Sequence, residues 1–362
     1  MGTTEDDAEA GGRTASLSWL WEWLRSGTLP AELPGDGSAV VEAATAQGLV
    51  GLLHAEASLR RPDWPAPVAQ RLRRRHLAQL CQCEIQLQTA GAVQRRLLAD
   101  GLRCLPLKGA AVAEALYRPG ERPMGDVDLL VLDDFAAAQD VLLRDGWQVE
   151  ETADHAVALR SRQAPVLLEL HRSAASCPGL HRHDGDGLWR RSRSTSGRLI
   201  RVPAPEDLLV LLSIHAAFQH ALGLRLVQYL DLQRLLRGAA FDAALAVEAA
   251  ACAGAAGSVA LALHAARLLV GPLHAEVEAA FAPHLPRGLS AWLSARARDP
   301  RLLLFPTPRD IARVRWALAR GQRGRLLWET LAGAASRGWR GPLARGFRLG
   351  RRLLEPRAGR VP

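Results

Sequence analysis

Three acidic residues in the middle of the chain have the types and spacing of a divalent-metal site. Asp126 and Asp128 are two positions apart at the start of a predicted strand, so both side chains leave the same face. Carboxylates this close repel each other unless a cation lies between them, and oxygen ligands suit Mg²⁺ or Mn²⁺. Glu169 adds a third carboxylate and shares a strand face with His171 in the run VLLELH. The three acids could hold a pair of metal ions, with His171 in the same cleft.

Residues that suit a polyphosphate lie just before these acids. Lys108 is the only lysine among 46 basic residues, which indicates a position that needs a compact ammonium rather than the planar fork of arginine. Arg122 offers a second cation. Gly109 begins a predicted helix whose N-terminal amides could hold phosphate, and Gly125 follows in the next turn.

Each of these features also has an ordinary structural explanation. Two acidic residues separated by one position usually lie at a solvent-exposed strand end. A strand with one solvent-exposed face would likewise account for Glu169 and His171. Arg122 could be a surface arginine, and a lone lysine could survive by chance in a chain whose composition follows G+C-rich codons. The order and spacing of the whole set are more specific than any part of it.

Short strands and helices alternate around this set. We predict strands at 102–107, 127–132, 147–151, 156–161 and 165–171, with helices at 110–117 and 135–144. A long helix opens at Pro65 and stops at Gly101. Apolar periodicity predicts further helices at 206–220, 224–237, 241–254 and 257–270. The pattern predicts an α+β fold, with a small mixed β-sheet core flanked by N-terminal and C-terminal helical regions.

Composition divides the chain into segments and argues against a disulfide-rich, zinc-binding, secreted or membrane-spanning protein. We expect a disordered segment at 1–14, helices at 15–100, an α/β core at 101–203, a helical domain at 204–300 and a basic tail at 301–362. Five cysteines without CxxC spacing indicate neither a disulfide framework nor a zinc site. Residues 1–12 lack the basic and apolar regions of a signal peptide. The uncharged run 249–266 is Ala-rich with internal glycines, which favours a packed helix pair over a membrane span. We therefore expect a cytoplasmic protein.

Positive charge is concentrated at the C-terminal end. From Arg309 onward, 14 arginines face three acidic residues, a net charge of +11, so the other 308 residues carry −2. Aromatic residues such as Trp316, Trp328 and Trp339 are interleaved with these arginines. This tail could bind a nucleic acid, an acidic peptide or an anionic membrane surface. A helical element with a solvated basic face is the alternative.

The helical region after residue 204 contains weaker candidates. His215 and His220 are five positions apart, a poor fit to the i,i+4 spacing of a helical metal pair. We expect His215 and Asp231 to lie at the cleft, with Asp231 paired with Arg225 or capping a helix. A purely structural role explains both residues equally well. The polar run 181–186 resembles a metal site by composition, but its arginine and glycines favour a flexible surface loop.

Together these residues resemble a known family. The run LPLKGAAVAEALYRPGERPMGDVDLLV, followed by VLLELHR, is similar to the uncharacterised nucleotidyltransferase family of the polymerase-β-like superfamily, over about residues 75–240. The resemblance implies that Asp126, Asp128 and Glu169 are catalytic metal ligands, with Glu169 also able to act as a base. It further implies that the nucleotide triphosphate faces Lys108, Gly109, Arg122 and Gly125.

The implied reaction is attack of an acceptor oxygen on the α-phosphate of an NTP, with release of pyrophosphate. The acceptor could be a small molecule, a peptide, a protein or an RNA end. One departure weakens the expected phosphate contact, because Ala110 follows Gly109 where the superfamily usually has serine or a second glycine. The alternative is a catalytically inactive member that binds an acidic partner or nucleic acid through its basic tail.

Overall fold

A small sheet and a large helical body share the chain. The computed structural model describes residues 3–336 except 61–62, 178 and 239–240. The first elements are α1 (Thr3–Ser26), α2 (Ser38–Ala46), α3 (Val50–Arg60) and α4 (Ala66–Ala99). As predicted, α4 opens after Pro65 and stops at Gly101, whose φ of +78° is a conformation that glycine adopts without strain.

The sheet has five strands in the order β1-β2-β5-β4-β3. Their bounds are β1 (Cys104–Pro106), β2 (Val127–Val131), β3 (Trp147–Thr152), β4 (Ala156–Ser161) and β5 (Leu167–His171). β2 and β5 run parallel, whereas the other neighbours are antiparallel. The chain between β2 and β5 contains α6 (Phe135–Arg144) and the β3–β4 hairpin, which provides the crossover that a parallel pair needs. The predicted α+β fold with a small mixed sheet is confirmed.

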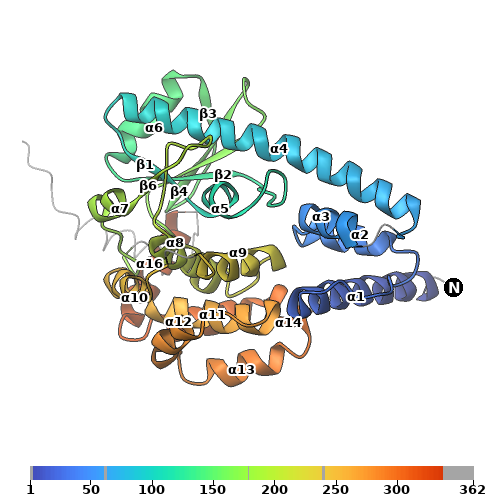
Figure 1. Ribbon diagram of the computed structural model, residues 1–362. Coiled ribbons are helices and arrows are strands. Elements are labelled where there is room, and N and C mark those ends of the chain that lie inside the picture. Colours follow the sequence, from blue (N-terminus) through green and yellow to red (C-terminus); the bar gives the residue numbers. More distant parts are fainter. Residues whose placement is uncertain (1–2, 61–62, 178, 239–240, 337–362) are drawn as a thin grey trace, which may run out of the picture.

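Two helices cover β2, and one of them also joins the two halves of the protein. α5 (Lys108–Leu116) and α4 both pack on β2, and all five residues of that strand are buried. Val68 and Leu72, near the start of α4, belong to the helical core, whereas Leu87 and Leu97, further along, belong to the core under the sheet. Figure 1 shows α4 running from the N-terminal helices across the sheet. This helix therefore fixes the sheet against the helical body.

The remaining elements are the other helices and a two-stranded sheet that lies against β1. They are α7 (Gly185–Arg191), β6 (Arg193–Ser194), β7 (Arg201–Val202), α8 (Pro205–Ser213), the π-helix η1 (Ile214–Gln219), α9 (Leu226–Leu236), α10 (Ala243–Cys252), α11 (Ala256–Val270), α12 (Ala275–Phe281), the 3₁₀ turn η2 (Ala282–His284), α13 (Leu289–Arg296), α14 (Pro300–Leu304), α15 (Pro308–Leu318) and α16 (Arg323–Ser336). α11 lies at the centre, in contact with α1, α8, α9 and η1. The run 249–266 is the predicted helix pair, α10 and α11 joined by a turn. No described helix is both long and apolar enough to cross a membrane.

Three features of the expected organisation differ from the structure. Residues 3–14 belong to α1, so the described part of the N-terminus is helical rather than disordered. The N-terminal and C-terminal helical regions share one hydrophobic core, because α1 packs on α11. The basic tail contributes α14, α15 and α16 to the same body, and its end, including Trp339, lies outside the described residues.

Candidate functional site

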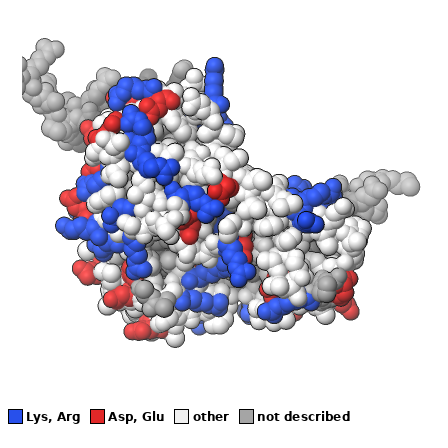
Figure 2. Space-filling view, turned by 45° about the horizontal axis from the view of Figure 1, so that its top comes forward, with Lys and Arg blue, Asp and Glu red and all other residues white. Residues whose placement is uncertain are grey.

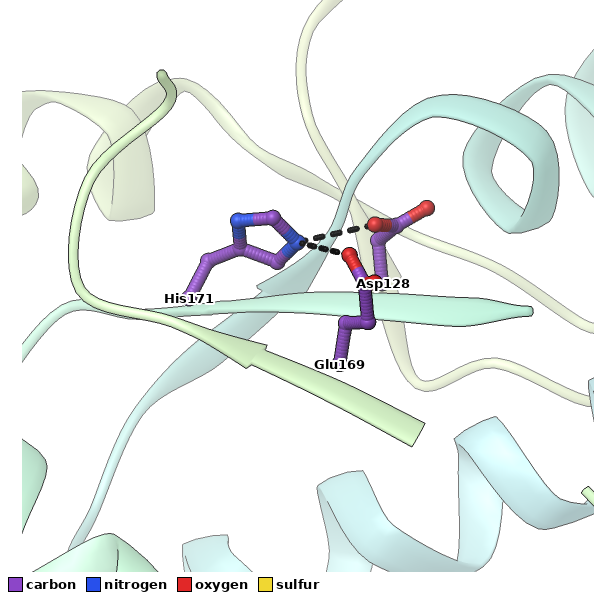
Figure 3. Close-up of side chains that lie close together, drawn as sticks. All are labelled: Asp128, Glu169 and His171. Carbon is purple, nitrogen blue, oxygen red and sulfur yellow. Dashed lines mark hydrogen bonds and ion pairs between the residues drawn. The ribbon is translucent and has the colours of Figure 1, made fainter. Parts of the chain in front are cut away.

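Two neighbouring parallel strands bring the predicted acids together. In the register of β2 and β5, Asp128 lies opposite Glu169, and Leu130 lies opposite His171. Alternation along each strand places the three polar side chains on one face. His171 Nε2 lies 2.8 Å from Asp128 Oδ1 and 3.2 Å from Glu169 Oε2. Dashed lines in Figure 3 mark these two contacts. Among the described residues these three form one group whose potential ligand atoms all lie within 4.8 Å of one another.

Lys108 reaches the same carboxylates from the start of α5. Its Nζ donates a 2.6 Å hydrogen bond to Asp128 Oδ1 and lies 4.0 Å from Glu169 Oε2. The backbone of Lys108 has a φ of +47°, a conformation that costs energy for a residue with a side chain and that recurs at functional sites. Helix α5 begins at Lys108 itself, two residues before the predicted start at residue 110.

The electrostatics show an excess of negative charge. Burial and the nearby charge of Asp128 raise the pKa of Asp126 to about 6. Burial alone would raise the pKa of Asp128, but Lys108 and His171 outweigh it and hold that pKa well below its usual value. Burial lowers the pKa of His171, and its hydrogen bonds to Asp128 and Glu169 reverse this effect and raise it. The positive charge of Lys108 therefore does not fully neutralise the three carboxylates. A bound cation would reduce the remaining repulsion between them.

The donor set fits a divalent ion. Asp128 and Glu169 provide carboxylate oxygens from adjacent strands, and Asp126 lines the same cleft immediately before β2. Both hydrogen bonds to the carboxylate of Asp128 end on Oδ1. His171 adds a nitrogen donor that the expected set of three carboxylates did not include, and imidazole suits transition metals better than Mg²⁺.

Arg122 lines the cleft, but its charge is engaged within the protein. Its guanidinium is buried in a two-pronged ion pair with Asp231 on α9, with Nη2 2.7 Å from Oδ2 and Nε 2.9 Å from Oδ1. The hydroxyl of Tyr117 donates to the same carboxylate at 2.8 Å. The expectation that Asp231 pairs with Arg225 or caps a helix is therefore wrong. Arg122 borders the cleft, but its charge is matched by Asp231 rather than free for a phosphate.

One face of α4 holds the loop that carries Arg122. Side chains of α4 donate to three carbonyls of this loop: Gln79 to Gly120, Cys83 to Arg122 and Gln86 to Met124. Positions 79, 83 and 86 recur with helical spacing and so point the same way. The loop is thus fixed on both sides before the chain enters β2.

The opposite side of the cleft is built on a π-helix. In η1 the amide of His220 donates to the carbonyl of His215, five residues earlier, and the two imidazole rings lie 4.4 Å apart. The five-residue spacing that fits an α-helix poorly fits this wider turn, and such turns are frequent at functional sites. Arg315 of α15 donates to the carbonyls of Phe218 and Gln219 at the end of η1. Part of the basic tail therefore supports this side of the cleft.

The two sides enclose a cavity of about 490 Å³. We call the first side the sheet wall (Lys108, Asp126, Asp128, Glu169, His171) and the second the helical wall (His215, Gln219, His220, Arg225, Gln228). Gly109 and Gly125 also line the cavity, as does Arg122. Among the described residues, no hydrogen bond or ion pair involves the guanidinium of Arg225, which is exposed and faces the cavity. The sequence predicted that Arg225 pairs with Asp231, so it did not identify Arg225 as a free cation of the cleft.

His181 is the one residue of the segment 181–186 that is buried, whereas the others are exposed or half-buried, as expected of a surface segment. His181 is 6% exposed and packs edge-on against Phe218 of η1, with ring centroids 4.7 Å apart. Neither ring nitrogen has a hydrogen-bond partner, and burial lowers the pKa of His181 to about 4. This histidine lies behind the helical wall as a neutral core residue.

The chain is similar in sequence to a known family and shows a weak likeness to a solved structure. The sequence model of a family described as "uncharacterised nucleotidyltransferase" matches residues 34–271. A crystal structure of an antigenic nucleotidyltransferase-like protein from Paracoccidioides brasiliensis is similar at 17% identity and a TM-score of 0.28, covering 42% of this chain and 75% of that one. Comparison with curated proteins gives no match.

Proposed function

Because the chain belongs to the uncharacterised nucleotidyltransferase family, we propose that it transfers NMP from an NTP to an acceptor, with Mg²⁺ or Mn²⁺ as cofactor. The observation that carries this proposal is the sheet wall. Carboxylates from two adjacent parallel strands and the only lysine of the chain converge on one cleft, with Lys108 Nζ 2.6 Å from Asp128 Oδ1. The acceptor class remains open among small molecules, peptides, proteins and RNA ends.

Each wall has a distinct part in this reaction. Asp126, Asp128 and Glu169 would hold the divalent ions, which supply charge neutralisation and polarise the phosphate. Glu169, 29% exposed at the side chain, is placed to accept the proton of the attacking hydroxyl. Lys108 and Arg225 are the cations positioned to contact the triphosphate. Arg122 acts through Asp231 by holding the loop that precedes β2.

Nucleotide binding tests this proposal before any acceptor is known. The melting temperature of the purified protein is measured with each NTP, with and without Mg²⁺ or Mn²⁺. Stabilisation that requires both nucleotide and metal supports the proposed function, since a ligand that binds the folded state raises its stability. An unchanged melting temperature with every nucleotide, together with a shift on adding RNA or an acidic peptide, would instead support the inactive binding protein.

The described surface gives the anionic-partner hypothesis only partial support. Figure 2 shows Lys and Arg side chains scattered among Asp and Glu on this face rather than collected in one continuous patch. Arg315 and Arg325 are also engaged within the protein, with the carbonyls of η1 and with Glu329 respectively. Binding of a nucleic acid or acidic peptide by the tail therefore stays a prediction, tested by a salt titration of affinity.

A further inference from the structure

Lys108 occupies Oδ1 of Asp128, one of the two carboxylate oxygens that this residue could offer to a divalent ion. Asp128 Oδ1 accepts from Lys108 Nζ at 2.6 Å and from His171 Nε2 at 2.8 Å, so both lone pairs of this oxygen are engaged. An ammonium has no lone pair and cannot become a ligand, whereas a neutral imidazole can. Of the two neighbours, Lys108 is therefore the one that has to leave when the oxygen ligates an ion.

Charge leads to the same conclusion. The side chains of Lys108 and Asp128 are only 18% and 3% exposed, so water and salt screen their interaction little. A divalent ion beside Asp128 would face the ammonium across a few ångströms, and like charges that close repel strongly in a partly buried site. Lys108 and the ion thus compete for one place.

The cleft offers Lys108 a second position. The residue begins α5, next to Gly109, and its four-carbon side chain can turn without movement of the backbone. A polyphosphate in the cleft would supply the new anionic partner. We infer that Lys108 is a counter-cation of Asp128, which leaves Oδ1 and moves to phosphate when metal and nucleotide bind together. The inference rests on the proposed function and adds an order of binding to it.

Removal of this cation has an unusual expected consequence. Lys108→Met should raise the affinity for Mn²⁺ in the absence of nucleotide by about tenfold or more, because the competing charge is gone. The same variant should weaken the binding of NTP. The affinity for Mn²⁺ is measured by electron paramagnetic resonance of the free ion, and circular dichroism checks the fold.

Two matched variants control for charge and for the site. Arg225→Met removes another cation from the same cleft, but its guanidinium is exposed and does not contact the carboxylates. It should change Mn²⁺ affinity by less than about threefold, since solvent screens it. Asp128→Asn should lose Mn²⁺ binding. Equal Mn²⁺ binding by wild type and Lys108→Met would overturn the inference alone, whereas absence of binding in both would overturn the metal-dependent function as well.

The lone lysine permits a test on the unaltered protein. Because Lys108 is the only lysine, selective carbon-13 labelling of lysine gives one side-chain signal in the NMR spectrum. Addition of Mg²⁺ with a non-hydrolysable NTP analogue should shift this signal, and Mg²⁺ alone should shift it only at much higher concentration. A signal that stays in place while Mg²⁺ and the analogue bind would show that Lys108 remains on Asp128, contrary to the inference.

Discussion

The two walls of the cleft differ in how they are assembled. The sheet wall takes its acids from two adjacent strands, whose register sets Asp128 opposite Glu169. The helical wall depends on a π-helix and on partners far apart in the sequence, such as Arg122 and Asp231, which are 109 positions apart. Local periodicity is therefore enough to put the acids of each strand on one face, whereas the pairing of β2 with β5 and the helical wall depend on long-range packing.

Two buried histidines show the same difference in their chemistry. On the sheet wall, hydrogen bonds to Asp128 and Glu169 outweigh burial and raise the pKa of His171. Behind the helical wall, His181 has no carboxylate partner, so burial lowers its pKa to about 4. The sheet wall is thus organised around charge, and the helical wall is organised around packing. The following predictions test this division.

The largest effect is expected from removing charge on the sheet wall. The double variant Asp126→Asn, Asp128→Asn should reduce transfer by at least about 10³-fold, because several kcal/mol of transition-state stabilisation depend on bound metal. Transfer is measured as incorporation of label from an NTP radiolabelled at the α-phosphate, and circular dichroism confirms the fold. Appreciable activity in the purified double variant would contradict the proposed function.

Removing charge beside the helical wall should instead cost stability. Arg122→Met leaves Asp231 buried without its partner, and breaking a buried ion pair in this way costs about 3–5 kcal/mol of unfolding free energy. Chemical denaturation measures this loss. Arg225→Met is the matched control, since its exposed guanidinium should leave stability unchanged to within about 0.5 kcal/mol. Similar stabilities of the two variants would show that the ion pair with Asp231 does not join α9 to the loop.

Acid should weaken the packing behind the helical wall. His181 has a pKa of about 4 when folded and an ordinary value of 6.5, so between these values the unfolded chain binds a proton that the folded protein does not. The stabilisation from neutral His181 is complete above pH 6.5 and is lost as the pH falls toward 4. The free energy of unfolding falls by up to about 1.4 kcal/mol per pH unit in this range. His181→Phe keeps a ring against Phe218 and should flatten this part of the stability profile. An identical slope in both proteins would assign the acid sensitivity to other groups.

The smallest effect concerns the turn beside the sheet wall. A Cβ on Gly109 would lie 2.8 Å from Cγ of the buried Met124, whereas a Cβ on Gly125 would meet nothing within 4 Å. Gly109→Ala should therefore cost about 1 kcal/mol of unfolding free energy, and Gly125→Ala should be neutral. Thermal denaturation of the two variants measures the difference. Equal melting temperatures would show that Met124 moves aside freely.

Several elements were predictable because their signals are local. Strand alternation predicted that Asp126 and Asp128 face the same way. The helix signals at Pro65 and Gly101 predicted both ends of α4. The predicted bounds of α6 and β4 agree with the structure. The order of the strands was not predictable in this way, because β3 and β4 separate β2 from β5 in the chain but not in the sheet.

Local spacing did not predict how the helical wall is built. Spacing rules for α-helices made His215 and His220 a poor pair, but the extra residue of a π-turn aligns them, and the five-residue interval itself was the available signal. Arg225 is closer to Asp231 in sequence than Arg122 is, so a local argument chose the wrong partner. The run 181–186 is polar and mostly exposed, yet the edge-on contact with Phe218 accompanies the burial of His181.

The sequence by itself determined the chemistry of this protein: three acids at strand spacing, a single lysine before a helix, and the elements that carry them. These follow from periods of two and 3.6 residues, which act over a few positions. Tertiary structure alone decided which cation is free and which is paired. Packing of α9 against the loop buries Arg122 with Asp231, leaves Arg225 exposed to the cleft and sets Lys108 on Asp128. Partner choice depends on distance in space and on burial, and neither is encoded in local spacing.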